Sequence, residues 1–129
     1  MWAALRVGGC VNGASPAYNA EEMAYALKTA QSKILLTLPS SLDVAVAAAE
    51  QTGIPKSHVL LLEGQRDGFT SIQQLTKEFD HGSASPVWSL PSGKSNREVC
   101  GYLNFSSGTT GLPKAVQVRR SRSIVPSKR

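Results

Sequence analysis

The sequence predicts an α/β fold in which parallel strands alternate with helices. Short continuous apolar runs recur along the chain, and a segment with apolar residues at helical spacing follows each of the first three. Apolar runs bounded by turn residues are typical of buried parallel strands. Strand–helix alternation is typical of a parallel sheet with flanking helices. At 129 residues, the chain is long enough for one modest domain.

The first 79 residues are predicted to contain most of the regular structure. Residues 2–6 are expected to be the last turn of a helix that Gly8 and Gly9 end. Strands are expected at residues 11–14, 33–37 and 58–62, and helices at residues 20–31, 42–52 and 72–79.

Capping residues predict where these helices begin and end. Asn19 and Glu22 stand at capping-box spacing, and residues 70–71 stand at the same spacing from residues 73–74. Gly53 is expected to end the second helix in a left-handed conformation. The helix bounds are therefore predicted from local sequence alone.

The pattern stops between residues 80 and 98, where Gly, Ser and Pro dominate. An irregular stretch of this length is uncommon inside a compact domain. Val87, Trp88 and Leu90 are its candidate apolar anchors. Residues 101–105 are then expected to form another strand.

The net charge of +5 comes from the C-terminal end of the chain. Five of the 14 basic residues lie from Gln117 onward, so the remaining nine match the nine acidic residues. An alternative function is therefore a non-catalytic chain that binds nucleic acid or acidic surfaces through this end. The segment has no aromatic residue for base stacking, which makes nucleic acid the less favoured partner.

Cysteines and histidines give no sign of a metal site. Cys10 and Cys100 are too few and too far apart in sequence for a disulfide framework or a zinc cluster. We expect them to be reduced thiols packed as small apolar groups. His58 and His81 have no partner at ligand spacing, so no metal ligand is predicted.

Targeting signals are weak. Arg6 interrupts the apolar start too early for a secretion signal, and no apolar run approaches the roughly 20 residues of a membrane span. The last three residues only partly resemble a peroxisomal signal. The expected location is intracellular, either cytoplasmic or peroxisomal, and not secreted.

The segment of residues 106–114 combines hydroxyls, glycines and a lysine directly after a predicted strand. It reads Ser106-Ser107-Gly108-Thr109-Thr110-Gly111-Leu112-Pro113-Lys114. Glycines let backbone N–H groups approach an anion, hydroxyls donate hydrogen bonds and a lysine adds positive charge. An ordinary polar turn uses the same residue types. A Walker loop is disfavoured because Ala115 follows Lys114.

These residues resemble the signature phosphate loop of the adenylate-forming (AMP-binding) superfamily, which includes acyl-CoA synthetases, 4-coumarate–CoA ligases and peptide-synthetase adenylation domains. Residues 8–22 are similar to an upstream segment of these enzymes, with Ser15 in the usual Asn place. The resemblance extends over residues 2–118 and is nearest to the 4-coumarate–CoA ligase-like and fatty acyl-CoA synthetase branch.

The resemblance implies an ATP-dependent acid–CoA ligase that adenylates a carboxylic acid and then forms a CoA thioester. ATP, Mg²⁺ and coenzyme A are the implied cofactors. The implied ATP contacts, with Gly111 as backbone support, are Ser106, Ser107, Gly108, Thr109, Thr110, Gly111 and Lys114. No residue of the chain is assigned a catalytic or metal-binding role, and the acyl substrate and oligomeric state stay open.

The resemblance also predicts a fragment: part of a sheet from the large N-terminal domain of such an enzyme. Residues 1–118 are expected to be a partial AMP-binding domain, and residues 119–129 a disordered basic tail foreign to the family. A frame change, an unspliced intron or a truncated gene model would explain such a tail. Because the family's later elements, including its catalytic lysine, are not found here, the chain is expected to be inactive and marginally folded alone.

Overall fold

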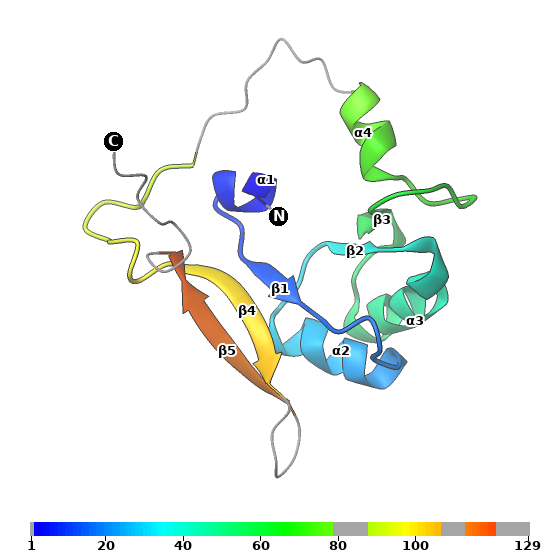
Figure 1. Cartoon of the computed structure of the whole chain (residues 1–129), viewed down its shortest axis with the longest axis horizontal. Coiled ribbons are helices and arrows are strands. Elements are labelled where there is room, and N and C mark those ends of the chain that lie inside the picture. Colours follow the sequence, from blue (N-terminus) through cyan, green and yellow to red (C-terminus); the bar gives the residue numbers. More distant parts are fainter. Residues whose placement is uncertain (1, 79–87, 107–112, 121–129) are drawn as a thin grey trace. The chain divides into compact units, whose positions relative to one another are not determined.

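The computed structural model describes residues 2–78, 88–106 and 113–120 (Figure 1). They belong to two units: a helical unit, Ala14–Ala84, and a sheet unit, Met1–Gly13 with Ser85–Arg129. The elements are α1 (Trp2–Arg6), β1 (Val11–Gly13), α2 (Ala20–Thr29), β2 (Leu35–Thr37), η1 (Pro39–Ser41), α3 (Leu42–Thr52), η2 (Lys56–His58), β3 (Val59–Leu61), α4 (Ile72–Glu78), β4 (Cys100–Ser106) and β5 (Lys114–Arg119).

The helical unit packs two helices, α2 and α3, with a small parallel sheet. Strands β2 and β3 pair in parallel, with Leu35 opposite Val59 and Thr37 opposite Leu61. The buried core of the unit is Met23, Ala24, Leu27, Leu35, Leu42, Ala45, Ala48, Ala49, Ile54, Val59 and Leu61. Small alanines predominate on the buried side of α3, which suits close packing against α2.

The predicted caps of α2 and α3 are confirmed. Asn19 Oδ1 accepts a hydrogen bond from the Glu22 backbone N–H at 2.9 Å, and Glu22 Oε2 accepts one from the Asn19 N–H at 3.0 Å. Gly53 ends α3 with φ of 71°, and Ile54 behind it is buried in the core. Helix α3 begins and ends at the predicted residues.

Helix α4 begins as predicted but buries little. Ser71 and Gln74 form the reciprocal bonds of a capping box, at 2.8 and 3.2 Å. Ile72 and Leu75 are only half-buried, and no residue of the helix is fully buried. Phe79, the third member of the predicted apolar stripe, lies outside the described residues.

The expectation that the strand at residues 33–37 is buried throughout is wrong for one of its faces. Leu35 and Thr37 are each 8% exposed, whereas Ile34 is 60% and Leu36 43% exposed. Successive strand residues point to opposite faces, and the helices of this unit pack against the Leu35 face. The outer face of β2 is therefore apolar and open.

The sheet unit contains three strands in the order β1-β4-β5 (Figure 1). Strand β1 pairs with β4 in parallel, with Val11 opposite Tyr102 and Gly13 opposite Asn104. Strand β5 then pairs antiparallel with β4. The expected mixed fold with parallel strands is confirmed, but β5 was not among the predicted strands.

No helix in the described parts of the chain is long and apolar enough to cross a membrane.

Candidate functional site

A β-hairpin holds both ends of the candidate phosphate loop. Ser106 is the last residue of β4 and Lys114 the first of β5, and the two are register partners. Cα atoms of directly opposed antiparallel residues lie about 4.5–5.5 Å apart. Both residues are exposed, so their side chains are accessible to a ligand. Of the other predicted contacts, Ser107, Gly108, Thr109, Thr110 and Gly111 lie outside the described residues.

The hairpin register runs unbroken from the loop back to Tyr102. Phe105 opposes Ala115, and Asn104 opposes Val116. At the far end the register shifts between Cys100 and Tyr102, which marks an irregularity at Gly101. A Cβ added to Gly101 would lie 3.3 Å from Arg120 Cγ, so a larger residue would crowd the arginine.

The hydroxyl of Ser106 and the ammonium of Lys114 suit an anionic ligand. A hydroxyl donates a hydrogen bond to a phosphate oxygen, and a lysine supplies a flexible point charge. The hairpin fixes the backbone of both residues relative to each other. The two ends of the loop therefore carry side chains of the kinds that contact phosphate in proteins.

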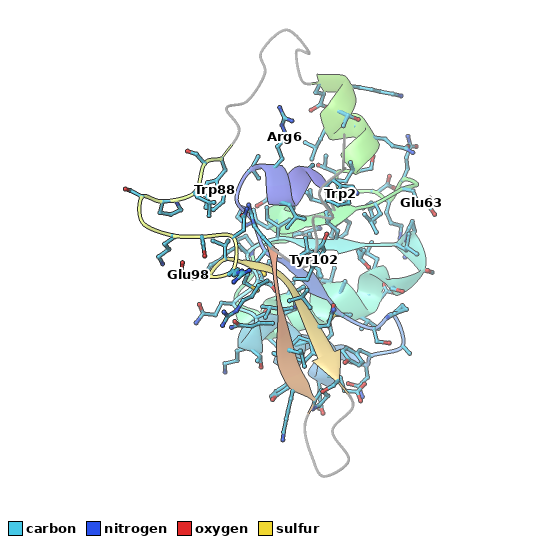
Figure 2. The ribbon with its side chains drawn as sticks, turned by 60° about the vertical axis from the view of Figure 1, so that its left-hand side comes forward. Trp2, Arg6, Glu63, Trp88, Glu98 and Tyr102 are labelled. Atoms are coloured by element: carbon cyan, nitrogen blue, oxygen red, sulfur yellow. The ribbon has the colours of Figure 1, made fainter. Side chains whose placement is uncertain are left out.

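Arg120 follows β5, at the end of the hairpin opposite to the loop, and joins three segments of the sheet unit. Its guanidinium carbon lies 4.4 Å above the centre of the Trp88 ring, and its Nη2 donates to the Gly9 carbonyl at 3.2 Å. The Trp88 N–H in turn donates to the Arg6 carbonyl at 3.0 Å. Figure 2 shows Trp88 on the segment before β4 and Arg6 at the end of α1. Trp88, one of the three predicted anchors, is thus confirmed, whereas Leu90 is half-buried and Val87 lies outside the described residues.

The role of Arg120 was missed by sequence reasoning. Arg120 is only 8% exposed, and its buried Nε has no hydrogen-bond partner among the described residues. Because it is buried, Arg120 does not contribute to the basic surface that would bind nucleic acid or acidic surfaces in the alternative function. The disordered tail predicted from residue 119 is wrong for its first two residues, because Arg119 ends β5 and Arg120 is buried. For the rest of the tail it stays a prediction, because residues 121–129 lie outside the described part.

Two cysteines meet in the same unit. Cys10 Sγ donates to Cys100 Sγ across 3.2 Å, although 90 residues separate them. Partial desolvation of the Cys10 thiol disfavours the thiolate. Together with the bond to Cys100, it raises the pKa of Cys10 to about 12. Both are free thiols. Their separation in sequence gave no indication of this contact.

Among the described residues, histidine and acidic side chains form no second site. His58 Nδ1 lies 3.0 Å from the Lys33 carbonyl, a contact that joins η2 to the segment before β2. His81 lies outside the described residues. Within residues 2–78, 88–106 and 113–120, no group of three His, Cys, Asp or Glu side chains could hold a metal ion.

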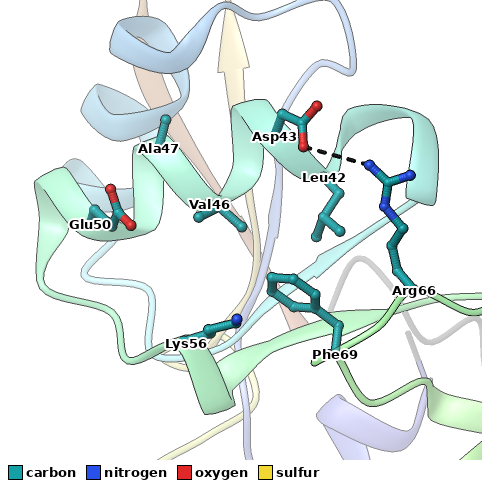
Figure 3. A pocket seen from close by; sticks show the side chains of 8 residues that line it. All are labelled: Leu42, Asp43, Val46, Ala47, Glu50, Lys56, Arg66 and Phe69. Atoms are coloured by element: carbon teal, nitrogen blue, oxygen red, sulfur yellow. Dashed lines mark ion pairs between the residues drawn. The ribbon is translucent and has the colours of Figure 1, made fainter.

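A pocket of about 490 Å³ lies beside α3 in the helical unit (Figure 3). Lys56 stacks 4.6 Å above the Phe69 ring, and Arg66 Nη2 lies 3.8 Å from Asp43 Oδ1. Each cation in the pocket already has a partner, and the Asp43–Arg66 pair is largely exposed. The hairpin is therefore the stronger candidate site.

The comparison with protein families decides which kind of protein carries this hairpin. The sequence model described as "AMP-binding enzyme" matches residues 1–127. The chain belongs to the AMP-binding enzyme family. The predicted resemblance to adenylate-forming enzymes is thereby confirmed.

Relatives of this AMP-binding enzyme chain include proteins named as ligases. It is 36% identical over 115 residues to a phenylacetyl-CoA ligase of Aspergillus niger, covering 87% of this chain and 21% of the ligase. The chain therefore spans about a fifth of the length of the curated relatives it matches.

Solved structures share its fold. A red-emitting luciferase from Phrixothrix hirtus superposes with a TM-score of 0.70 at 25% identity, covering 92% of this chain and 29% of the luciferase. An anthranilate CoA ligase in complex with anthranoyl-AMP superposes with a TM-score of 0.68 at 22% identity, covering 89% of this chain and 21% of the ligase. The AMP-binding chain thus has the fold of a part of these enzymes.

Proposed function

We propose that this chain carries the part of an acid–CoA ligase that holds the β- and γ-phosphates of ATP. The observation that supports this most directly is the opposition of Ser106 and Lys114 at the two ends of the loop. Residues 107–111 supply the remaining hydroxyls and glycines between them. Family membership and the phenylacetyl-CoA ligase relative support the same assignment.

In the proposed reaction, a carboxylate attacks the α-phosphate of ATP and pyrophosphate leaves. The thiol of coenzyme A then displaces AMP from the acyl-adenylate. The loop acts by positioning and by electrostatic stabilisation of the leaving phosphates. Mg²⁺ would come with the nucleotide, and no residue of this chain is assigned to it or to coenzyme A.

The 129-residue chain is proposed to bind the nucleotide without completing the ligase reaction. Its assigned residues hold phosphates, and none is assigned to acyl binding or proton transfer. Incubation of the chain with ATP, Mg²⁺, phenylacetate and coenzyme A should release no pyrophosphate above background. Steady release that Lys114→Met abolishes would contradict the proposed inactivity while supporting the loop assignment.

Nucleotide binding is tested by titrating the full chain with Mg·ATP and measuring affinity by calorimetry. Lys114→Met should weaken binding roughly tenfold or more, because hydrogen bonds to charged groups contribute about 1.5–3 kcal/mol. Lys94→Met is the matched control, since Lys94 is exposed in the same unit and lies outside the loop. It removes the same charge and should leave the affinity nearly unchanged.

Circular dichroism on each variant separates loss of binding from loss of folding. A folded chain that does not bind Mg·ATP would overturn the proposal. So would equal losses from the Lys114 and Lys94 variants, because these would show a general charge effect.

A further inference from the structure

The pair Cys10 and Cys100 is the group that the proposed function does not use. Cys10 directly precedes β1, and Cys100 is the first residue of β4. Their sulfur atoms lie 3.2 Å apart. The contact joins segments that are 90 residues apart, so the fold of the sheet unit creates it.

The strand register explains the contact. Val11 lies opposite Tyr102 in the parallel pair, which brings Cys10 level with Gly101. Gly101 has no side chain, and the register of β4 shifts beside it. The Cys100 sulfur can therefore approach Cys10 where β1 and β4 begin.

The pair is close to the geometry of a covalent bond. A disulfide S–S bond is about 2.05 Å long, so the two sulfurs need to approach by about 1 Å from their present 3.2 Å. Cys10 is exposed, so a small oxidant can reach the pair. The Cys100 thiol also donates to the Tyr102 carbonyl at 3.3 Å, which holds its side chain at the start of β4.

We propose that Cys10 and Cys100 form a reversible disulfide that links β1 to β4, with a low-molecular-weight disulfide such as oxidised glutathione as the oxidant. The proposal rests on strand register and sulfur contact, and is independent of nucleotide binding. It replaces the expectation of two reduced thiols packed as small apolar groups with that of a redox-sensitive pair.

The exchange proceeds in two balanced steps. The Cys100 sulfur, after losing its proton to solvent, attacks one sulfur of oxidised glutathione and releases one glutathione thiolate. Cys10 then loses its proton and attacks the Cys100 sulfur, and the second glutathione leaves. The protein gives up two protons and two electrons, and oxidised glutathione becomes two reduced glutathiones.

The cross-link would lie at the start of β1 and β4, the end of β4 opposite to the phosphate loop. Both strands start near the sulfurs, and β4 runs seven residues to Ser106, roughly 20 Å at about 3.3 Å per residue. The bond would therefore leave the loop chemistry untouched. It would prevent β1 from separating from the strand that carries the loop.

The test equilibrates the reduced full chain with mixtures of reduced and oxidised glutathione, quenches with acid and alkylates the remaining thiols. Mass spectrometry should show loss of two hydrogen atoms and a peptide joining Cys10 to Cys100. The equilibrium constant for this internal bond should be roughly tenfold or more above its value in denaturing urea, because the fold holds the thiols together. Cys10→Ser and Cys100→Ser are the controls, and each should instead form a mixed disulfide with glutathione.

Several results would overturn the proposal. Equal constants in buffer and in urea would show that the fold does not favour the bond, whether the chain is folded or not. Mixed disulfides on both cysteines of the parent chain would show that the sulfurs do not meet. A folded chain that stays reduced where the urea-treated chain oxidises would show that the fold opposes the bond.

Discussion

The helical unit and the sheet unit bury different kinds of side chain. The helical unit encloses a cluster of eleven buried residues, nearly all alanine or aliphatic. In the described part of the sheet unit, the buried residues are Gly101 and Arg120. Apolar burial therefore stabilises the first unit, whereas backbone pairing and a few long-range contacts hold the second. The two units should respond to different substitutions.

The largest effect is expected from removing a core side chain of the helical unit. Leu61 is fully buried, and Leu61→Ala should lower the free energy of unfolding by about 2–5 kcal/mol. Urea unfolding followed by circular dichroism measures the change. Leu62→Ala is the control, because Leu62 is 47% exposed and should change the stability by about 0.5 kcal/mol or less. Equal losses from both variants would contradict the described core.

A smaller effect, confined to the sheet unit, is expected from Arg120→Met. The substitution removes the stacking on Trp88 and the bond to the Gly9 carbonyl, and it also relieves the unpaired Nε. We expect a net loss of about 1–2 kcal/mol. Amide hydrogen exchange should report it in β1 and β4 while α2 and α3 stay protected. Arg119→Met is the control and should have little effect, because Arg119 is exposed. Loss of protection in both units on Arg120→Met would contradict the division into two units.

Two glycines allow a matched test of backbone strain in each unit. Gly53 has φ of 71° and Gly93 has φ of 81°, and neither has a neighbouring atom within 4 Å of an added Cβ. Substitution by alanine therefore costs about 1–2 kcal/mol of conformational strain, without steric overlap. Hydrogen exchange should show Gly53→Ala weakening the helical unit and Gly93→Ala weakening the sheet unit. If Gly53→Ala and Gly93→Ala weakened the same unit, the division into a helical unit and a sheet unit would be wrong.

The smallest effect concerns Glu98, which is fully exposed. Its carboxylate accepts bonds from the Ser95 N–H at 2.8 Å and from the Ser95 hydroxyl at 3.1 Å, and these lower its pKa below the ordinary 4.5. A lowered pKa stabilises the folded form above that ordinary value, and the contribution is lost as the pH falls through the folded pKa. NMR should show the Ser95 amide resonance moving with a midpoint below pH 4.5. A midpoint above that value would contradict the described bonds, and Glu98→Gln should remove the transition.

Local signals in the sequence predicted the helical unit well. Asn19 with Glu22, and Gly53, act within five residues of the helix ends they define, so their effect can be recognised without the fold. Gln31 also takes a positive φ of 52° after α2, and no glycine marks that position. Helix bounds were thus predictable wherever the capping residue is a characteristic one.

Long-range features could not be predicted in this way. The contact between Cys10 and Cys100 and the bond from Arg120 to Gly9 depend on which strands become neighbours. Strand β5 mixes polar and apolar residues, and its burial does not alternate strictly, so its six residues gave no clear strand pattern. The two ends of the candidate site were predicted because the phosphate loop is a contiguous segment, but their opposition across a hairpin was not.

One face of β2 and of the residues that flank it carries a row of exposed aliphatic side chains. Ile34, Leu36 and Leu38 alternate with buried residues and are 60, 43 and 38% exposed. Such a row favours self-association as the concentration rises, since contact between copies removes it from water. Light scattering should therefore rise steeply with protein concentration. A lysine in place of Leu36 should raise the concentration at which scattering begins, while Leu35 stays in the core.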